Sequence, residues 1–270
     1  MYPRVSDTLT SANAGKYTVS IRLRPGGLSF AGVNPDDRAD LFFEEIALDR
    51  KKPYVQALKD TFFSHAFFTY SFRQVFVLCV NRRYTVVPAS VFVEKQKDEL
   101  MSFAFSSSGY RTLCEPADDL EAKIVFGMQS DVYEFCSRSL LRPRYAHAVT
   151  RLLSLWRKQS LTCLPKQQYV ALHEGVMYAA CFDRGALCFV NSFNCEDMAD
   201  VLYYTLYIWK QVGMEQLHDE LYIATDAATY EKVSVELKEY VPNVRAFVFP
   251  WPEAPSGAPP DVMAFFACES

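Results

Sequence analysis

The sequence predicts an α/β protein that runs twice through the same series of elements, strand-strand-strand-helix-strand-helix. Residues 17–33 contain two strand patterns joined by a tight turn with adjacent glycines. Residues 168–191 contain three strand patterns joined by two glycine turns. A helical pattern and a further strand follow in each half, which predicts two lobes, each with a mixed five-stranded sheet and flanking helices. The predicted lobes are residues 1–142 and 143–270.

The first elements of the N-terminal lobe follow from simple patterns. Residues 19–23 alternate apolar and polar side chains, as in a half-buried strand, and residues 28–33 return from the turn. Residues 41–48 predict a third strand. Residues 53–65 predict a helix, because proline is tolerated at the first helical position and the apolar residues keep helical spacing.

The rest of the N-terminal lobe is less regular. Residues 74–80 are almost continuously apolar, which predicts a strand buried on both faces. A helix is expected from Ser90 to about Phe103. Residues 106–122, rich in Ser, Gly, Pro and Asp, predict a surface loop. Two more strands are expected, and their ranges are 123–128 and 131–136.

The C-terminal lobe begins with an amphipathic helix that starts at Pro143. Three strands are expected next, followed by a helix with Asn194 as its N-cap and a broad apolar stripe. A strand at 221–225, a helix at 227–240 and a strand at 244–248 complete the lobe. The Pro-rich segment 250–260 is expected to be extended, and the apolar end of the chain to dock back as a strand or short helix.

Composition excludes several classes of function. The net charge is −4 and no basic stripe occurs, so we expect no nucleic-acid partner. No stretch is long and apolar enough to insert in a membrane, and the polar N-terminus is not a secretory signal, so the predicted location is cytoplasmic. The eight cysteines are then expected to be reduced. None forms Cys-x-x-Cys and no histidine lies at ligand spacing, so we expect no metal site.

One cysteine pair has two interpretations. If Arg184 and Gly185 form a two-residue turn, Cys181 lies directly opposite Cys188 on the neighbouring strand. The pair is then either two small apolar neighbours or a redox pair.

The sequence resembles a bacterial family catalogued only as a domain of unknown function with an actin-like ATPase fold. The resemblance covers nearly the whole chain and rests on residues 17–23, residues 185–193, Asp200 and the pair Tyr203-Tyr204. It implies two ribonuclease H-like lobes of the ASKHA type, similar in architecture to actin-like modules of pilus and secretion assembly. These are packing residues, so the resemblance implies a fold and no mechanism.

Actin-like ATPases hold Mg²⁺ and phosphate at an Asp-x-Gly-Ser/Thr turn in the first hairpin. Depending on register, the carboxylate position is here Ser20, Arg22 or Arg24, and none of these can hold a hard cation. Pro25 removes one backbone donor. Gly26 and Gly27 could cradle an anion beside Arg24, but a plain hairpin turn explains them. The chain has only 10 glycines, which also argues against glycine-built phosphate loops.

The other two nucleotide elements of this fold are altered as well. Glu174 and Gly175 form the second turn, but Val176 follows where Ser or Thr is required. The late segment around Asp226 has alanines in place of the glycine pair that approaches adenosine, and Asp226 would repel phosphate if it faced the site.

These departures favour a non-catalytic actin-like protein that acts through contacts with an unknown protein partner. It would have degenerate nucleotide motifs, no catalytic residues and no cofactor. The alternative is a divergent Mg-ATP-dependent enzyme with ATP hydrolysis or phosphotransfer in an inter-lobe cleft. Its candidate residues are Arg24, Gly26, Gly27, Glu174, Gly175 and Asp226, with Asp197 or Asp200 nearby.

The sequence leaves a third functional possibility open, a regulator that binds a small anion at Arg22 and Arg24. For His147, which lies among arginines and aromatic residues, a structural role is expected. The oligomeric state is left open by the sequence.

Overall fold

The computed structural model describes residues 5, 9–106, 108–251 and 257–269. The chain divides into two compact units. The first contains the described residues up to Thr150, with 257–258 and those from Phe265 onward; the second contains residues 151–251 and 259–264. The predicted lobe boundary at 142/143 stays a prediction.

The first unit is built on a mixed five-stranded sheet with the order β3-β2-β1-β4-β8. The three strands of the meander are antiparallel, and β4 and β8 add in parallel. The strands are β1 Thr18–Arg24, β2 Gly27–Asn34, β3 Asp37–Ala47, β4 Gln74–Cys79 and β8 Arg144–His147. Gly32 is required in β2, because a Cβ there would lie 2.3 Å from the Phe42 ring.

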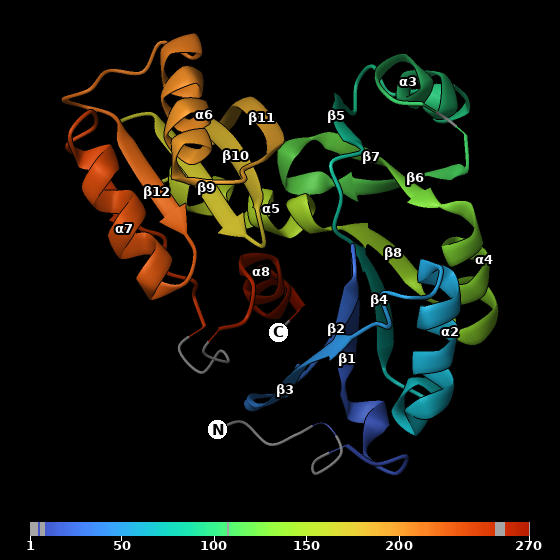
Figure 1. The fold of residues 1–270 in the computed structure, drawn as a ribbon. Helices are drawn as coiled ribbons and strands as arrows, with labels where there is room; N and C mark the ends of the chain where they lie inside the picture. The colour runs from blue at the N-terminus through green and yellow to red at the C-terminus, as the bar shows by residue number, and fades with distance from the viewer. Residues whose placement is uncertain (1–4, 6–8, 107, 252–256, 270) are drawn as a thin grey trace. The chain divides into compact units, whose positions relative to one another are not determined.

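Helices and a smaller sheet complete the first unit. Helices α2 Tyr54–Ser64 and α4 Ser130–Ser139 lie side by side, with Phe62 edge-on to Phe135 at 5.0 Å (Figure 1). The second sheet has the order β5-β7-β6 and packs with α3. The elements of this part are β5 Tyr84–Pro88, α3 Lys97–Ala104, β6 Tyr110–Ala117 and β7 Ala122–Gln129. Short 3₁₀ turns lie at Ala14–Lys16, Ala66–Thr69, Glu94–Gln96 and Asp118–Leu120.

The second unit contains another mixed five-stranded sheet, with the order β11-β10-β9-β12-β13. Both large sheets therefore place their strands in the order third, second, first, fourth, fifth along the sequence. The strands are β9 Gln167–His173, β10 Val176–Asp183, β11 Ala186–Asn194, β12 Glu220–Ala224 and β13 Val244–Ala246. The helices of this unit are α6 Met198–Gln211 and α7 Ala227–Lys238, while α5 Ala148–Ser160 and α8 Pro260–Glu269 belong partly to each unit.

The core of the second unit lies between its sheet and the helices α6 and α7. Met177, Ala179 and Cys181 of β10 pack there with Val201 and Ile208 of α6, among others. On the other face, the Tyr169 ring lies between Trp156, at 5.6 Å, and Tyr222, at 5.2 Å. The apolar stripe of α6 therefore has the buried role that its spacing predicts.

Four predicted elements between residues 90 and 147 differ from the structure. Residues 131–136 belong to α4, where Val132, Phe135 and Cys136 are buried at helical spacing. The expected loop at 106–122 contains β6, which pairs with β7 over its full length. Pro143 does not start a helix, because residues 144–147 extend the sheet as β8 before α5 begins. The helix expected from Ser90 begins only at Lys97.

The N-cap of α6 is Asp197 and not Asn194. Asn194 is the last residue of β11, and the Asp197 carboxylate accepts a hydrogen bond from the Asp200 N–H at 3.1 Å. The chain end forms α8. In the described part of the chain, no helix combines the length and apolar character needed to cross a membrane.

Candidate functional site

The first predicted site turn is a tight hairpin between β1 and β2. Arg24 pairs with Gly27 across it, and Pro25 and Gly26 form the turn. Gly26 has a φ of +80°, which matches a type II turn with proline before glycine. The backbone conformation at this turn therefore agrees with the prediction of a plain hairpin turn.

The guanidinium group of Arg24 lies against this turn. An ideal Cβ on Gly27 would be 3.0 Å from Arg24 Cζ, and Arg24 Nη2 donates to Glu45 Oε2 at 3.1 Å. The Arg50 guanidinium lies 3.7 Å from the Cβ position of Gly26. The Arg24 and Arg50 side chains therefore lie close to Gly27 and Gly26.

A cavity of about 370 Å³ lies beside the turn within the first unit. It is lined by Leu23, Arg24, Pro25, Gly26, Tyr54, Cys79, Val80, Asn81, Arg83, Tyr110, Met128, Gln129 and Val132. Arg24 and Gly26 thus meet in one cavity, whereas Gly27 is not part of its lining. No lining residue is an Asp or Glu, so this cavity contains no carboxylate for Mg²⁺.

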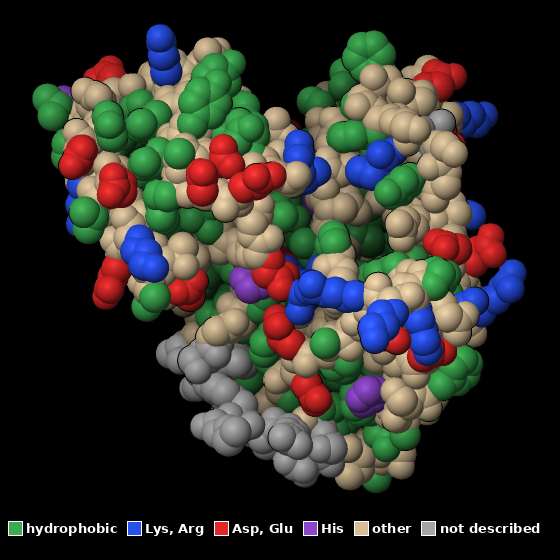
Figure 2. All heavy atoms as spheres, viewed as in Figure 1, with side chains coloured by type: hydrophobic (Ala, Val, Ile, Leu, Met, Phe, Trp, Pro, Cys, Tyr) green, Lys and Arg blue, Asp and Glu red, His purple; other side chains and the backbone are tan. Residues whose placement is uncertain are grey.

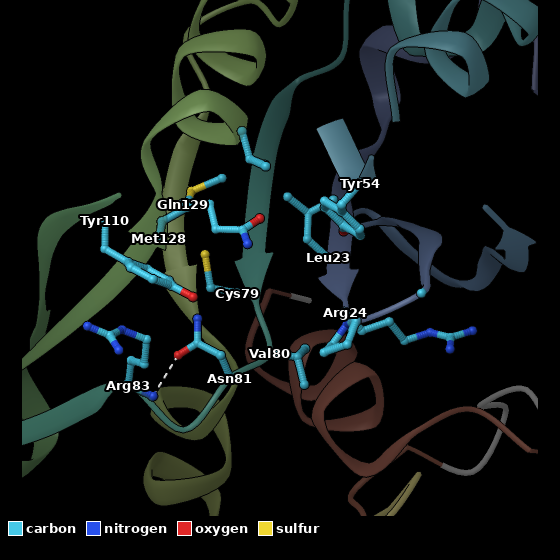
Figure 3. Close-up of a pocket in the computed structure, with 13 residues that line it drawn as sticks. Leu23, Arg24, Tyr54, Cys79, Val80, Asn81, Arg83, Tyr110, Met128 and Gln129 are labelled. Carbon is cyan, nitrogen blue, oxygen red and sulfur yellow. Dashed lines mark hydrogen bonds between the residues drawn. The ribbon is translucent and has the colours of Figure 1, made fainter. Parts of the chain in front are cut away.

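The middle of the cavity is mostly apolar. Figure 3 shows Leu23 and Tyr54 on one side and Met128 and Tyr110 on the other, while the Arg24 and Arg83 heads point away from the middle. Tyr54 Oη donates to the Gly27 carbonyl at 3.4 Å, and burial raises the pKa of this phenol. Tyr54 therefore stays neutral.

Arg83 fixes the outer wall of the cavity. Its guanidinium carbon lies 3.9 Å from the centre of the Tyr110 ring and 5.2 Å from that of Phe105, and Nη2 donates to the Ser106 carbonyl. Its backbone N–H donates to Asn81 Oδ1 at 2.8 Å. The wall is thus held by a cation between two aromatic rings.

The arginines do not form an open anion site at the turn. Arg22 has 2% of its surface exposed, because β1 is covered on both faces. Arg24 is paired with Glu45. Arg22 and Arg24 therefore do not offer the accessible pair of guanidinium groups that a small-anion regulator would need.

The second predicted site turn joins β9 to β10. Glu174 and Gly175 both have positive φ, +50° and +73°, as a type I′ hairpin turn requires. The turn borders a cavity of about 250 Å³ within the second unit, which brings Glu174, Gly175 and Asp226 together as the sequence suggested. Asp197 also lines it, whereas Asp200 does not.

The electrostatics of this second cavity oppose phosphate. Its lining holds four carboxylates and no lysine or arginine; the four are Glu174, Glu196, Asp197 and Asp226. Asp226 caps α7, since its carboxylate accepts from the Thr229 N–H at 3.0 Å and from the Thr229 hydroxyl at 2.6 Å. These hydrogen bonds lower the pKa of Asp226. The N-termini of α6 and α7 therefore already carry their own anions.

His147 has a structural role, as expected. It is fully buried, Nε2 lies 2.9 Å from the Asn81 carbonyl, and Nδ1 accepts from the Val149 N–H at 3.2 Å. This arrangement fits only the neutral ring with its proton on Nε2. The backbone N–H of His147 and the hydroxyl of Thr150 both donate to Glu115.

The expected register of the cysteine pair is wrong. Cys181 lies opposite Phe189, and Phe182 lies opposite Leu187, so Cys188 is the extra residue of a β-bulge. Both cysteines are free thiols, and burial raises the pKa of Cys181. The bulge removes the directly opposite pairing, and burial disfavours a thiolate at Cys181.

The sequence did not indicate the far wall of the first cavity. Tyr54, Tyr110 and Met128 come from α2, β6 and β7. Because residues 106–122 were predicted to be a loop, the strand that carries Tyr110 was not predicted. The only local signal was the run Gly109-Tyr110-Arg111, where a glycine with positive φ precedes a strand.

Comparison with known proteins agrees with this architecture. A crystal structure from Bacteroides thetaiotaomicron, of a protein with actin-like ATPase fold and unknown function, is similar with a TM-score of 0.85 and 26% identity. The alignment covers 96% of this chain and 99% of that one. A structure of the PilM-PilN type IV pilus biogenesis complex is similar at a TM-score of 0.51 and 10% identity, covering 93% of this chain and 97% of that one. No curated protein matches.

The family follows from the sequence match itself. Residues 6–244 match the family described as "Protein of unknown function (DUF3822)". This match covers most of the 270 residues, and two mixed five-stranded sheets with flanking helices form the framework of the fold. The chain therefore belongs to the DUF3822 family and has an actin-like ATPase fold.

Proposed function

We propose that this protein is a non-catalytic member of the actin-like fold that acts through protein contacts. The observation that carries the proposal is the Arg24 guanidinium, which packs on Gly27 and pairs with Glu45. An ATPase needs a carboxylate and open backbone N–H groups at this turn. A guanidinium that is held by its own carboxylate does not supply the carboxylate that Mg²⁺ needs.

The second turn supports the same proposal. Bound phosphates carry several negative charges, and the cavity at the second turn is lined by four carboxylates and no lysine or arginine. Like charges repel, and the repulsion is stronger in a partly buried site than in water. Both turns keep hairpin geometry while their chemistry is unsuited to a nucleotide.

The first cavity suits a side chain of a protein partner. Its middle is apolar, with Leu23, Tyr54 and Met128 around it, and its volume of about 370 Å³ accommodates one large apolar side chain. The similarity to a pilus biogenesis complex is compatible with this role, because that neighbour forms a complex with another protein.

Calorimetric titration with Mg-ATP tests the absence of nucleotide binding. We expect no saturable heat up to millimolar nucleotide, because the turns offer a paired cation and a set of carboxylates. Micromolar binding that Gly26→Val abolishes would establish the alternative, a divergent ATP-dependent enzyme. Gly213→Val is the matched control, because Gly213 also has positive φ, +64°, and lies in the second unit.

A pull-down tests the protein contact. Gln129 is exposed and lines the first cavity, so Gln129→Trp should fill the cavity without disturbing the core. We expect one specific partner from cell extract and its loss with this variant. Gln96→Trp, at an exposed position outside the lining, should retain the partner. Equal capture by both variants would show that the cavity is not the contact site.

A further inference from the structure

Arginines without a carboxylate partner lie beside the first cavity. Arg82 and Arg83 are in the connection between β4 and β5, and Arg50 follows β3. In the part of the chain that the structure describes, none of these three side chains forms an ion pair, whereas Arg24 is paired with Glu45. The cavity therefore has positive charge beside it that is left for an external anion.

These arginines lie on two sides of the cavity. The Arg50 guanidinium is 3.7 Å from the Cβ position of Gly26, which belongs to the turn on one wall. Arg83 is part of the lining near Tyr110, and Arg82 precedes it at an exposed position (Figure 3). Figure 2 shows Lys and Arg side chains on this face of the first unit, both at the level of α2 and at the level of the β5-β7-β6 sheet. An anionic chain that crosses the cavity thus meets a cation on each side.

The acids that are close to these arginines in the sequence or the fold have local partners. The Asp49 carboxylate accepts a hydrogen bond from the Lys51 N–H at 2.9 Å. Asp131, in the first turn of α4, accepts one from the Val132 N–H at 2.8 Å. Neither Asp49 nor Asp131 lines the cavity, whose lining holds two arginines and no Asp or Glu. Positive charge therefore predominates at the rim.

Arg83 keeps hydrogen-bond donors for an external acceptor. A guanidinium group has five N–H donors, and in the described contacts of Arg83 only Nη2 donates, to the Ser106 carbonyl. Its Nε is buried without an acceptor among the described residues. The ring of Tyr110 holds the guanidinium in place, so a carboxylate at the rim meets donors that are already oriented.

The middle of the cavity and its rim select different chemical groups. Leu23, Tyr54 and Met128 lie around the middle, where burial favours an apolar side chain. The Arg24 and Arg83 heads point away from the middle, so an anion is favoured only at the rim (Figure 3). A ligand that satisfies both regions has one large apolar group with acidic groups on either side. A peptide segment offers this order, whereas a small amphiphilic acid carries its charge at one end.

We propose that the first cavity receives an acidic segment of the partner protein, which inserts one large apolar side chain between Tyr54 and Met128 and places carboxylates near Arg50 and Arg83. This inference rests on the proposed function, because it names the chemistry of the segment that makes the protein contact. The apolar side chain supplies most of the affinity, since it leaves water. The acids supply selectivity and faster association, because the net charge of the whole chain is −4 and this rim is a local positive region.

A library of short random peptides displayed on phage tests the segment, with the full chain as bait. We expect the selected sequences to converge on one Trp, Phe or Leu flanked by Asp and Glu. Gln129→Trp, which fills the cavity, should abolish this convergence, and Gln96→Trp should retain it. A failure to converge on wild type would overturn the inference.

Two other results of the selection separate this inference from the proposed function. Sequences that need the open cavity but lack acids would overturn the acidic segment and leave a protein contact at the cavity standing. Sequences that wild type and Gln129→Trp select equally would count against the cavity as a contact site at all, and so against both.

The charge at the rim is tested with the peptide that the selection gives. Fluorescence anisotropy should show binding weakened by roughly tenfold or more when Arg50→Glu and Arg82→Glu are combined, because each attraction becomes a repulsion. Both residues are exposed, so the core is not disturbed. Lys16→Glu with Lys95→Glu makes the same charge change at exposed positions outside the lining and should alter the affinity by less than about twofold.

The peptide itself supplies the complementary variant. Replacing its acids by Asn and Gln should weaken binding to wild type much more than binding to the variant with both arginines reversed, as expected for directly coupled charges. Equal losses in the two double variants of the protein, or no coupling to the acids of the peptide, would overturn the proposal. Dodecanoate that displaces the peptide at concentrations below the peptide's own Kd would also overturn it, since the cavity would then take a free amphiphilic acid.

Discussion

Single side chains decide the chemistry of both turns. The Arg24 guanidinium lies against the first turn and pairs with Glu45. Asp226 sits at the start of α7 and satisfies two donors of Thr229. Each of these residues therefore has a structural partner within its own unit.

The cap at Asp226 leads to a prediction for stability and its pH dependence. Asp226→Ala should lower the free energy of unfolding by about 0.5–2 kcal/mol, because the Thr229 N–H loses its acceptor. The hydrogen bonds lower the pKa of Asp226 in the folded state. Its contribution is therefore full above the unfolded pKa and is lost as pH falls through the folded pKa.

Urea denaturation at pH 7 and at acidic pH measures both effects. Asp226→Asn keeps an acceptor and removes the titration, so its stability relative to wild type should improve as pH falls. A wild-type protein and an Asp226→Ala variant that differ by the same amount at every pH would contradict this role of the carboxylate.

At the level of elements, strands and helices with a clear period could be predicted from the sequence. The meander β1-β2-β3 and the buried apolar stripe of α6 were predicted, because alternation and helical spacing report burial directly. Residues 131–136 were mistaken for a strand, because six residues are too few to distinguish the strand period of about 2 residues from the helical period of about 3.6. β6 was missed, because Pro116 and its polar neighbours are typical of a loop and only pairing with β7 makes them a strand.

Ser160 ties three elements together at the end of α5. Its hydroxyl donates to Gln167 Oε1 at 2.7 Å and accepts from the Gly185 N–H at 3.1 Å, and the residue is fully buried. Ser160→Ala should therefore lower the free energy of unfolding by about 1–3 kcal/mol, since two buried polar groups lose their partner. Ser154→Ala, on the same helix and half-buried, should cost much less in thermal or urea unfolding. Equal costs for the two variants would count against the network.

At the scale of the whole molecule, the two-lobe architecture could be predicted, and the walls of the cavities could not. The sheet order follows from repeated hairpins and crossover helices, which sequence patterns report. The residues around the first cavity come from α2, β4, β6, β7 and α4, and nothing local indicates that they meet at the Pro25-Gly26 turn. The turns themselves were found, because glycine at positive φ leaves a local signal in the sequence.

The path of the chain through α5 and α8 has a consequence for inheritance. Three residues of α5 and the last part of α8 belong to the first unit, while the rest of each helix belongs to the second. A gene fragment that encoded one unit alone would end inside a helix and expose its cut backbone groups. A crossover at a boundary between the units would therefore fall inside α5 or α8, so an exchange of one unit for a foreign one would interrupt a helix.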